Sequence, residues 1–220
     1  MNASAIFRVA ALATVSFATD LRADAPEPLL ETRLTLHTDA ASAGPALTTA
    51  AAPAQTSADP FAAGRWVVNF YGSGTWADDA GDFYQGHVGV GFHIVNNLSI
   101  NLELVAGETD SDQEEFGAED GWNAGFDLLL RWHFCRTGAW SIYVDGGAGM
   151  IWFDDAFPAG GTHQNFTPQL GLGITYQINE NLMLMAGGRW HHVSNARKSG
   201  VDRNPGFDGG MLYLGVMLPF

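Results

Sequence analysis

The segment WNAGFDLLLRWHF, residues 122–134, decides the fold class because it divides its side chains between two unlike faces. Its even positions are mostly large and apolar: Trp122, Ala124, Phe126, Leu128, Leu130, Trp132 and Phe134. Its odd positions include the polar residues Asn123, Asp127, Arg131 and His133. Since successive side chains of a β-strand point to opposite faces, this period of two predicts a strand with one apolar and one polar face.

The same alternation recurs after Arg65 and predicts eight strands in all. They cover about 65–76, 83–95, 97–107, 121–135, 139–153, 164–178, 181–195 and 207–220. All seven tryptophans, at positions 66, 76, 122, 132, 140, 152 and 190, fall on the apolar face. Tight connections at 96–97, 136–138 and 179–180 alternate with longer ones at 77–82, 108–120, 154–163 and 196–206. This alternation of short and long connections is typical of transmembrane barrels.

The apolar face is predicted to point outward, although alternation by itself also fits a soluble barrel or sandwich. Eight strands enclose only enough space for side chains to fill, and rows of large aromatic residues would overfill it. The opposite face is small and polar, with a few charges that suit a buried hydrogen-bonded network: Glu103, Asp127, Arg131, Asp145 and Arg189. The sequence therefore predicts an all-β fold, an eight-stranded antiparallel transmembrane β-barrel in an outer membrane of the Gram-negative type.

The first 63 residues do not follow the strand pattern. An apolar segment over 5–18, followed by Ala23-Asp24-Ala25, predicts a signal peptide over residues 1–25. Residues 26–63 contain five of the nine prolines and are rich in Ala, Thr and Ser, which predicts a disordered linker. The barrel domain is predicted to span 64–220. Since no other run approaches the roughly 20 apolar residues of a membrane-spanning helix, no such helix is expected.

The charge distribution excludes one class of partner and suggests another. A net charge of −14 leaves no basic footprint for nucleic acid. Three of only ten basic residues, Arg197, Lys198 and Arg203, fall within one long connection. We therefore expect these three side chains to attract the phosphate groups of a substrate at the outer membrane surface.

The motif HHVSNA, residues 191–196, lies beside this basic stretch at the outer end of the seventh strand. His192 and Ser194 continue the lipid-facing positions of that strand, and Asp208 lies on the same face of the eighth. Polar groups on a lipid-facing surface are costly and rare, although residues at the outer rim of a barrel are often merely polar. A hydroxyl, an imidazole and a carboxylate on one patch suit a nucleophile, its base and the group that orients the base. Symmetric pairing about the connection predicts Ser194 opposite Asp208 and His192 on a diagonal, at roughly 7 Å.

These residues also carry a resemblance to a known family. His192-Val193-Ser194-Asn195-Ala196, followed by Asn204-Pro205-Gly206 and a carboxylate, resembles the C-terminal signature of the outer-membrane lipid A 3-O-deacylases, the PagL family. The resemblance covers roughly residues 64–220, and its specific motifs lie near the C-terminus. It implies hydrolysis of the acyl ester at position 3 of lipid A within lipopolysaccharide, without a cofactor. It further implies Ser194 as nucleophile, His192 as general base, Asp208 as the acid that orients it and Asn195 in the oxyanion hole.

Two positions depart from the family pattern. Asp208 is one methylene shorter than the Glu that the family typically carries. Arg197 stands where a Gly usually follows the Asn-Ala pair and offers a backbone N–H to the oxyanion. Because a φ above zero is disfavoured for Arg, we do not expect a left-handed backbone at this position.

Other readings of the same residues remain open. A non-enzymatic small barrel, an adhesin or structural protein, and an esterase for a different acyl lipid are both alternatives to lipid A deacylation. His87, His93, His133 and His191 point inward, which favours a structural network, with His191 beside Arg189, over a metal cluster. The loop at 108–120 contains seven acidic residues but lacks the sixth-position Gly of an EF-hand loop, which favours a solvated loop.

Overall fold

The computed structural model describes residues 59–77, 80–112 and 119–220. The predicted signal peptide and residues 26–58 of the predicted linker lie outside the described residues. The described chain contains no helix that is both long and apolar enough to cross a membrane.

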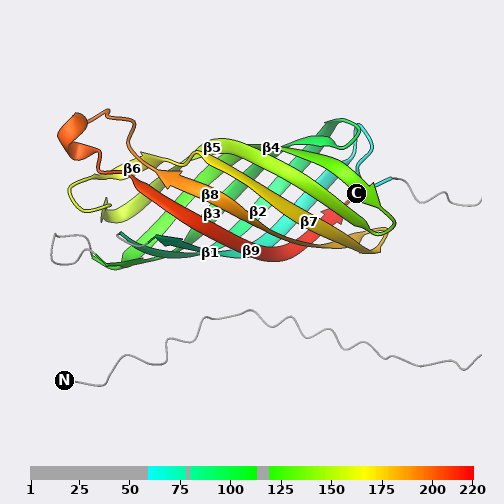
Figure 1. Cartoon of the computed structure of the whole chain (residues 1–220), viewed down its shortest axis with the longest axis horizontal. Coiled ribbons are helices and arrows are strands. Elements are labelled where there is room, and N and C mark those ends of the chain that lie inside the picture. The colour runs from blue at the N-terminus through cyan, green and yellow to red at the C-terminus, as the bar shows by residue number, and fades with distance from the viewer. Residues whose placement is uncertain (1–58, 78–79, 113–118) are drawn as a thin grey trace, which may run out of the picture. The chain divides into compact units, whose positions relative to one another are not determined.

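Antiparallel strands make up most of the described chain (Figure 1). They are β1 (Trp66–Ala77), β2 (Gly81–Val95), β3 (Leu98–Ser111), β4 (Gly121–Thr137), β5 (Trp140–Phe157), β6 (Thr162–Phe166), β7 (Gln169–Asn179), β8 (Leu182–Val193) and β9 (Phe207–Pro219), with one 3-10 turn, η2 (Val201–Arg203). Strands β1 to β5 pair in chain order, β5 pairs with β7, and β7, β8 and β9 pair in turn. Because β1 also pairs with β9, the sheet closes into a barrel. Closure leaves no free sheet edge, as a barrel in lipid requires.

The short strands β6 and β7 share one place in the ring, because both pair with β5. Thr167 and Pro168 separate them, and Pro168 has no backbone N–H to offer a neighbouring strand. Counted this way, the barrel has the eight strands that the sequence predicts.

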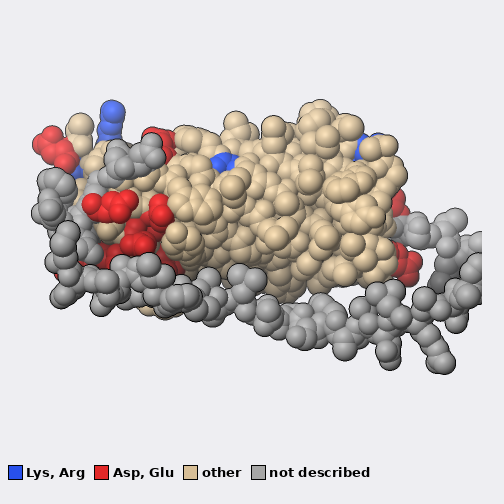
Figure 2. Space-filling model, turned by 60° about the horizontal axis from the view of Figure 1, so that its bottom comes forward, with Lys and Arg blue, Asp and Glu red and all other residues tan. Residues whose placement is uncertain are grey.

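The large apolar side chains lie on the outside of the barrel, as predicted. All seven tryptophans are between 42% and 63% exposed, whereas the five charged residues predicted to face inward are at most 3% exposed. Figure 2 shows the acidic side chains gathered toward the ends, with a broad, nearly uncharged band between them. This band is the surface that faces membrane lipid.

The interior is less uniformly small and polar than predicted, because large side chains also fill it. One cluster contains Phe61, Val67, Tyr71, Tyr143, Met183, Met185, Met211, Tyr213 and Met217, and a second contains Ala80, Phe83, Ile151, Phe153, Phe157, Val193 and Phe207. Glycines make room for two of the tyrosines. A Cβ at Gly173 would lie 2.3 Å from the ring of Tyr143, and one at Gly187 would lie 2.3 Å from the hydroxyl of Tyr213. Packing inside the barrel therefore depends on pairs in which a large side chain on one strand faces a glycine on another.

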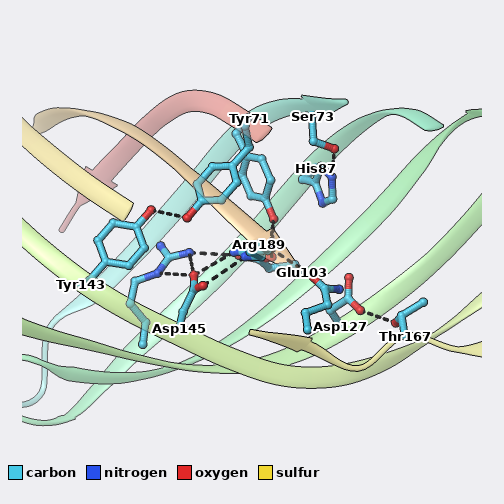
Figure 3. Close-up of polar contacts among 12 residues, drawn as sticks. Tyr71, Ser73, His87, Glu103, Asp127, Tyr143, Asp145, Thr167 and Arg189 are labelled. Atoms are coloured by element: carbon cyan, nitrogen blue, oxygen red, sulfur yellow. Dashed lines mark hydrogen bonds and ion pairs between the residues drawn. The ribbon is translucent and has the colours of Figure 1, made fainter. Parts of the chain in front are cut away.

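A buried ion network crosses the middle of the barrel (Figure 3). Asp145 accepts hydrogen bonds from both Arg131 and Arg189, with shortest N–O distances of 2.8 Å to each. Glu103 lies 3.6 Å from Arg131 and 3.4 Å from Arg189, and it also accepts the hydroxyl of Tyr71. Two cations thus face two anions, which is the condition under which charges persist in a protein interior. The predicted interior network is confirmed.

The inward histidines mostly bind neighbouring hydroxyl or carbonyl groups. His87 contacts Ser73 at 2.9 Å and His133 contacts Ser141 at 2.8 Å. The predicted partnership of His191 with Arg189 is wrong, because Arg189 is occupied by Asp145 and the ring of His191 instead packs edge-on against Phe83. Within the described ranges, no three His, Cys, Asp or Glu side chains are placed to hold a metal ion.

Residues 59–65 close the end of the barrel that carries the short turns. The side chain of Phe61 is 3% exposed and its ring lies 4.1 Å from that of His133. Asp59 binds Arg136 through two hydrogen bonds of 2.8 and 2.9 Å. Partial burial raises the pKa of Asp59, but the bonds from Arg136 and from the Phe61 N–H outweigh it and hold the pKa below its usual value. The last residues of the predicted linker are therefore packed against the barrel.

The connections at the opposite end differ in length from the prediction. Paired strands extend further than their apolar pattern, so only residues 78–80 separate β1 from β2, and β5 continues to Phe157. The longest connection was predicted at 108–120, but β3 continues to Ser111, and the connection between β8 and β9 is the longest between the described strands. It lies with η2 at the left of Figure 1. This connection carries most of the predicted site.

Candidate active site

Strands β8 and β9 bring His192 and Asp208 together on the membrane face of the barrel. The two residues are direct partners in the register of these strands, and His192 Nδ1 lies 2.9 Å from Asp208 Oδ1. The His192 side chain is 25% exposed and that of Asp208 is 64% exposed. Because Nδ1 is held by the carboxylate, Nε2 is the ring nitrogen left to exchange a proton with a substrate or nucleophile.

The register differs by one pair from the symmetric pairing predicted, which placed Ser194 opposite Asp208. One register holds along the whole β8–β9 ladder, from Met183 opposite Met217 to Val193 opposite Phe207. Beyond Val193 the two strands separate, and Ser194 pairs instead with Phe166 of β6. The Ser194 N–H donates to the Phe166 carbonyl at 3.1 Å, and the Phe166 N–H donates to the Ser194 carbonyl at 2.7 Å. The backbone of Ser194 is therefore fixed on both sides.

Ser194 lies two residues beyond His192 and so shares its face of the strand. Its side chain is half-buried. Among the described residues its hydroxyl has no hydrogen-bond partner, and His192 is not bonded to it. Hydrogen bonds between nucleophile and base are often long in free enzymes and shorten when substrate binds. The structure thus joins two of the three predicted residues and places the third beside them.

A second donor binds Asp208. The Trp190 indole Nε1 donates to the same oxygen, Oδ1, at 2.9 Å. The rings of Trp190 and His192 stack with centroids 5.7 Å apart and planes inclined by 23°. The sequence pattern assigned Trp190 only to the lipid-facing row, so this contact was missed. The single available signal was its position two residues before His192.

Asn195 shapes the connection that follows Ser194. It is 3% exposed, and its backbone N–H donates to Asn204 Oδ1 at 2.8 Å. Its side-chain amide donates to the carbonyl of Arg203, and its Oδ1 accepts the Arg197 N–H at 2.9 Å. The backbone N–H, the Oδ1 and one amide N–H of Asn195 are thus engaged within the connection. A role for Asn195 in an oxyanion hole stays a prediction.

Arg197 adopts the left-handed backbone that was not expected for it. Its φ is 62°, and that of Ala196 is 52°. The hydrogen bond from the Arg197 N–H to the Asn195 side chain, together with one of 3.1 Å from the Lys198 N–H to the Asn195 carbonyl, holds this turn. Side-chain hydrogen bonding by Asn195 therefore overrides the steric preference of Arg197, at a strain of about 1–2 kcal/mol per residue.

Arg197→Gly is expected to stabilise the barrel by about 0.5–1 kcal/mol. The relief of backbone strain in the folded state exceeds the cost of the greater conformational entropy that Gly gives the unfolded chain. The free energy of unfolding in lipid vesicles, measured by urea titration, checks this. Ser199→Gly is the matched control, since Ser199 lies in the same connection without a positive φ. If the two substitutions have equal effects, or if Arg197→Gly lowers the free energy of unfolding, the backbone of Arg197 is not strained.

The three basic residues, Arg197, Lys198 and Arg203, lie in and just after this turn, and all are exposed. Arg203 donates to the carbonyl of Gly161 at 3.2 Å, which ties the connection to the loop between β5 and β6. The Lys198 ammonium lies 5.5 Å from the centre of the Phe166 ring, beside Ser194 in the sheet. The structure thus places the predicted cations in one exposed connection next to Ser194.

The closed barrel, its apolar outer band and a polar site at one rim define an outer-membrane β-barrel protein. Two solved structures are similar to it. The outer membrane protein OprG from Pseudomonas aeruginosa has a TM-score of 0.50 at 14% identity, over 73% of this chain and 98% of that one. At this identity the likeness shows the fold alone. The N-terminal barrel domain of OprF from the same organism has a TM-score of 0.49 at 19% identity, over 72% and 98%.

A comparison with protein-family models shows the family to which this chain belongs. The family model described as lipid A 3-O-deacylase (PagL) matches residues 65–217, so this chain belongs to that family of outer-membrane lipid A deacylases. The crystal structure of the outer membrane enzyme PagL is similar at a TM-score of 0.43 and 16% identity, over 70% of this chain and 98% of that one. No curated protein matches the chain.

Proposed function

We propose that this protein is a serine esterase that hydrolyses the acyl ester at position 3 of lipid A in the outer leaflet. The observation that carries the proposal is the bond between His192 and Asp208 on the membrane face, with Ser194 on the same face two residues away. A lipid substrate held in the bilayer can reach only side chains on that face.

The chemistry follows from these positions. His192 Nε2 removes the Ser194 hydroxyl proton as the oxygen attacks the ester carbonyl carbon. Collapse of the tetrahedral intermediate breaks the bond to the sugar oxygen, which takes the proton from His192. Water then attacks the acyl-serine with His192 again as base, releasing the fatty acid and restoring Ser194. Asp208 keeps the Nδ1–H of His192 directed away from the nucleophile and stabilises the imidazolium that forms in each step.

Asn195 is proposed to stabilise the oxyanion, in keeping with the family resemblance. A donor aimed at the developing charge lowers the barrier by about 2.7–4 kcal/mol. Its backbone N–H is bound to Asn204 and one N–H of its side-chain amide to Arg203, which leaves the second amide N–H as the donor for the oxyanion.

The test uses purified protein and lipid A in mixed detergent micelles, followed by mass spectrometry with fragmentation. The proposal predicts that lipid A gains one water and loses one acyl chain, and that the missing chain is the ester at position 3. Unchanged lipid A mass would favour a non-enzymatic barrel. Release of acyl chains from phospholipid alone would make the protein an esterase for a different lipid.

Reversing the charge of Arg197 and Lys198 to Glu is expected to reduce activity on phosphorylated lipid A by about tenfold, because charge-assisted bonds to the phosphates are lost. Activity on a neutral ester of the same chain length should change little. Initial rates on both substrates check this, with Ser199→Glu as a control that adds charge without removing a cation. Equal losses of activity on the two substrates would contradict binding of the lipid A phosphates by Arg197 and Lys198.

A further inference from the structure

We propose that Trp190 is a positioning residue that holds the carboxylate of Asp208 against His192. The inference rests on the proposed function and deepens it. One oxygen atom, Asp208 Oδ1, accepts two hydrogen bonds. They come from the Trp190 indole N–H and from the His192 Nδ1–H, each at 2.9 Å.

The cross-strand geometry makes this arrangement available. His192 lies directly opposite Asp208, whereas Trp190 lies opposite Gly210 and is diagonal to Asp208. Gly210 presents no side chain, so nothing on β9 stands between the indole and the carboxylate. Trp190 can therefore lean toward Asp208, since diagonal neighbours on one sheet face lie within reach of an aromatic side chain.

The carboxylate needs a second donor because of where it lies. The side chain of Asp208 is 64% exposed on the membrane face. A single hydrogen bond to His192 would let the carboxylate turn about its last torsion. Two donors that meet on one oxygen fix that torsion and compensate part of the unfavourable exposure of a carboxylate at the lipid boundary.

Trp190 also supports the imidazole itself. Its ring stacks beside His192, so the same side chain fixes the carboxylate through its N–H and limits the movement of the imidazole through its face. Most tryptophans at a membrane interface direct the indole N–H to water or lipid headgroups. Here that donor binds a protein side chain in the proposed site.

The experiment is a double-mutant cycle measured as initial rates on lipid A in mixed micelles. Trp190→Phe keeps an aromatic ring and removes the N–H, and it is expected to lower kcat about tenfold with KM little changed. In the Asp208→Ala background the same substitution should cost less than about twofold, because the acceptor is already gone. Losses that multiply in the double variant, or no loss in Trp190→Phe, would overturn the proposal.

Trp76→Phe is the matched control. Trp76 is also lipid-facing, at 43% exposed, and lies on β1 at the other side of β9, where it contacts Tyr84 rather than Asp208. It should leave kcat unchanged. An equal loss in this variant would show that the effect comes from anchoring at the membrane interface.

A second readout does not depend on activity. In protein labelled with ¹⁵N-tryptophan, the indole N–H resonance of Trp190, assigned by its absence in Trp190→Phe, should move in Asp208→Ala while that of Trp76 stays in place. A resonance that does not move would refute the contact. If the contact is seen and the wild-type protein leaves lipid A intact, the proposed function fails and the contact stands.

Discussion

Ser194→Ala is expected to lower the rate of lipid A deacylation by about 1,000-fold or more, because removing the nucleophile of a serine hydrolase removes the acyl-enzyme route. In the proposed mechanism the Ser194 hydroxyl meets an ester in the outer leaflet, and His192, two residues away on the same face, is its base. Rates are measured by mass spectrometry of lipid A in mixed micelles.

The controls for this variant separate chemistry from folding. Ser199→Ala removes an exposed hydroxyl from the same connection and should retain wild-type activity. Both variants should show the heat-dependent shift in gel mobility of a folded barrel. Wild-type activity in folded Ser194→Ala would contradict a serine mechanism.

Asp145→Asn is expected to destabilise the barrel by about 3–5 kcal/mol, since breaking a buried ion network leaves uncompensated charge. Asp145 binds both Arg131 and Arg189, and all three side chains are completely buried. After the substitution Glu103 alone faces two guanidinium groups. The free energy of unfolding in lipid vesicles is the measurement.

Asp59→Asn provides the comparison for that result. It makes the same change in charge, but the ion pair of Asp59 with Arg136 is partly exposed at the barrel end, so a loss below about 1 kcal/mol is expected. Similar losses in the two variants would show that the interior network contributes no more than a surface pair.

The barrel and its orientation could be predicted from the sequence because a period of two fixes which face each side chain takes. Parity alone placed Trp122 and Arg131 on opposite faces, and the volume of the apolar side chains decided which face meets lipid. The interior tyrosines were harder to place. Tyr143 fits only because Gly173 faces it from another strand, and a single-strand pattern contains no information about that partner.

The face shared by His192, Ser194 and Asp208 was predictable for the same reason, but their register was not. The register is set along the whole β8–β9 ladder, which the alternation of one strand does not encode. The pairing of Ser194 with Phe166 is likewise a contact between segments that are distant in the chain. The turn at Arg197 likewise depends on the hydrogen bond that the Arg197 N–H donates to the Asn195 side chain. Steric preference alone predicted the opposite backbone.

The most direct test of the account asks whether Ser194 is an activated nucleophile reached from the membrane. Wild-type protein in lipid vesicles is treated with a long-chain alkyl fluorophosphonate, and the modified residue is located by peptide mass spectrometry. The account predicts one adduct, on Ser194, that is lost in His192→Ala. A protein that remains unlabelled, or one labelled at another residue, would contradict it.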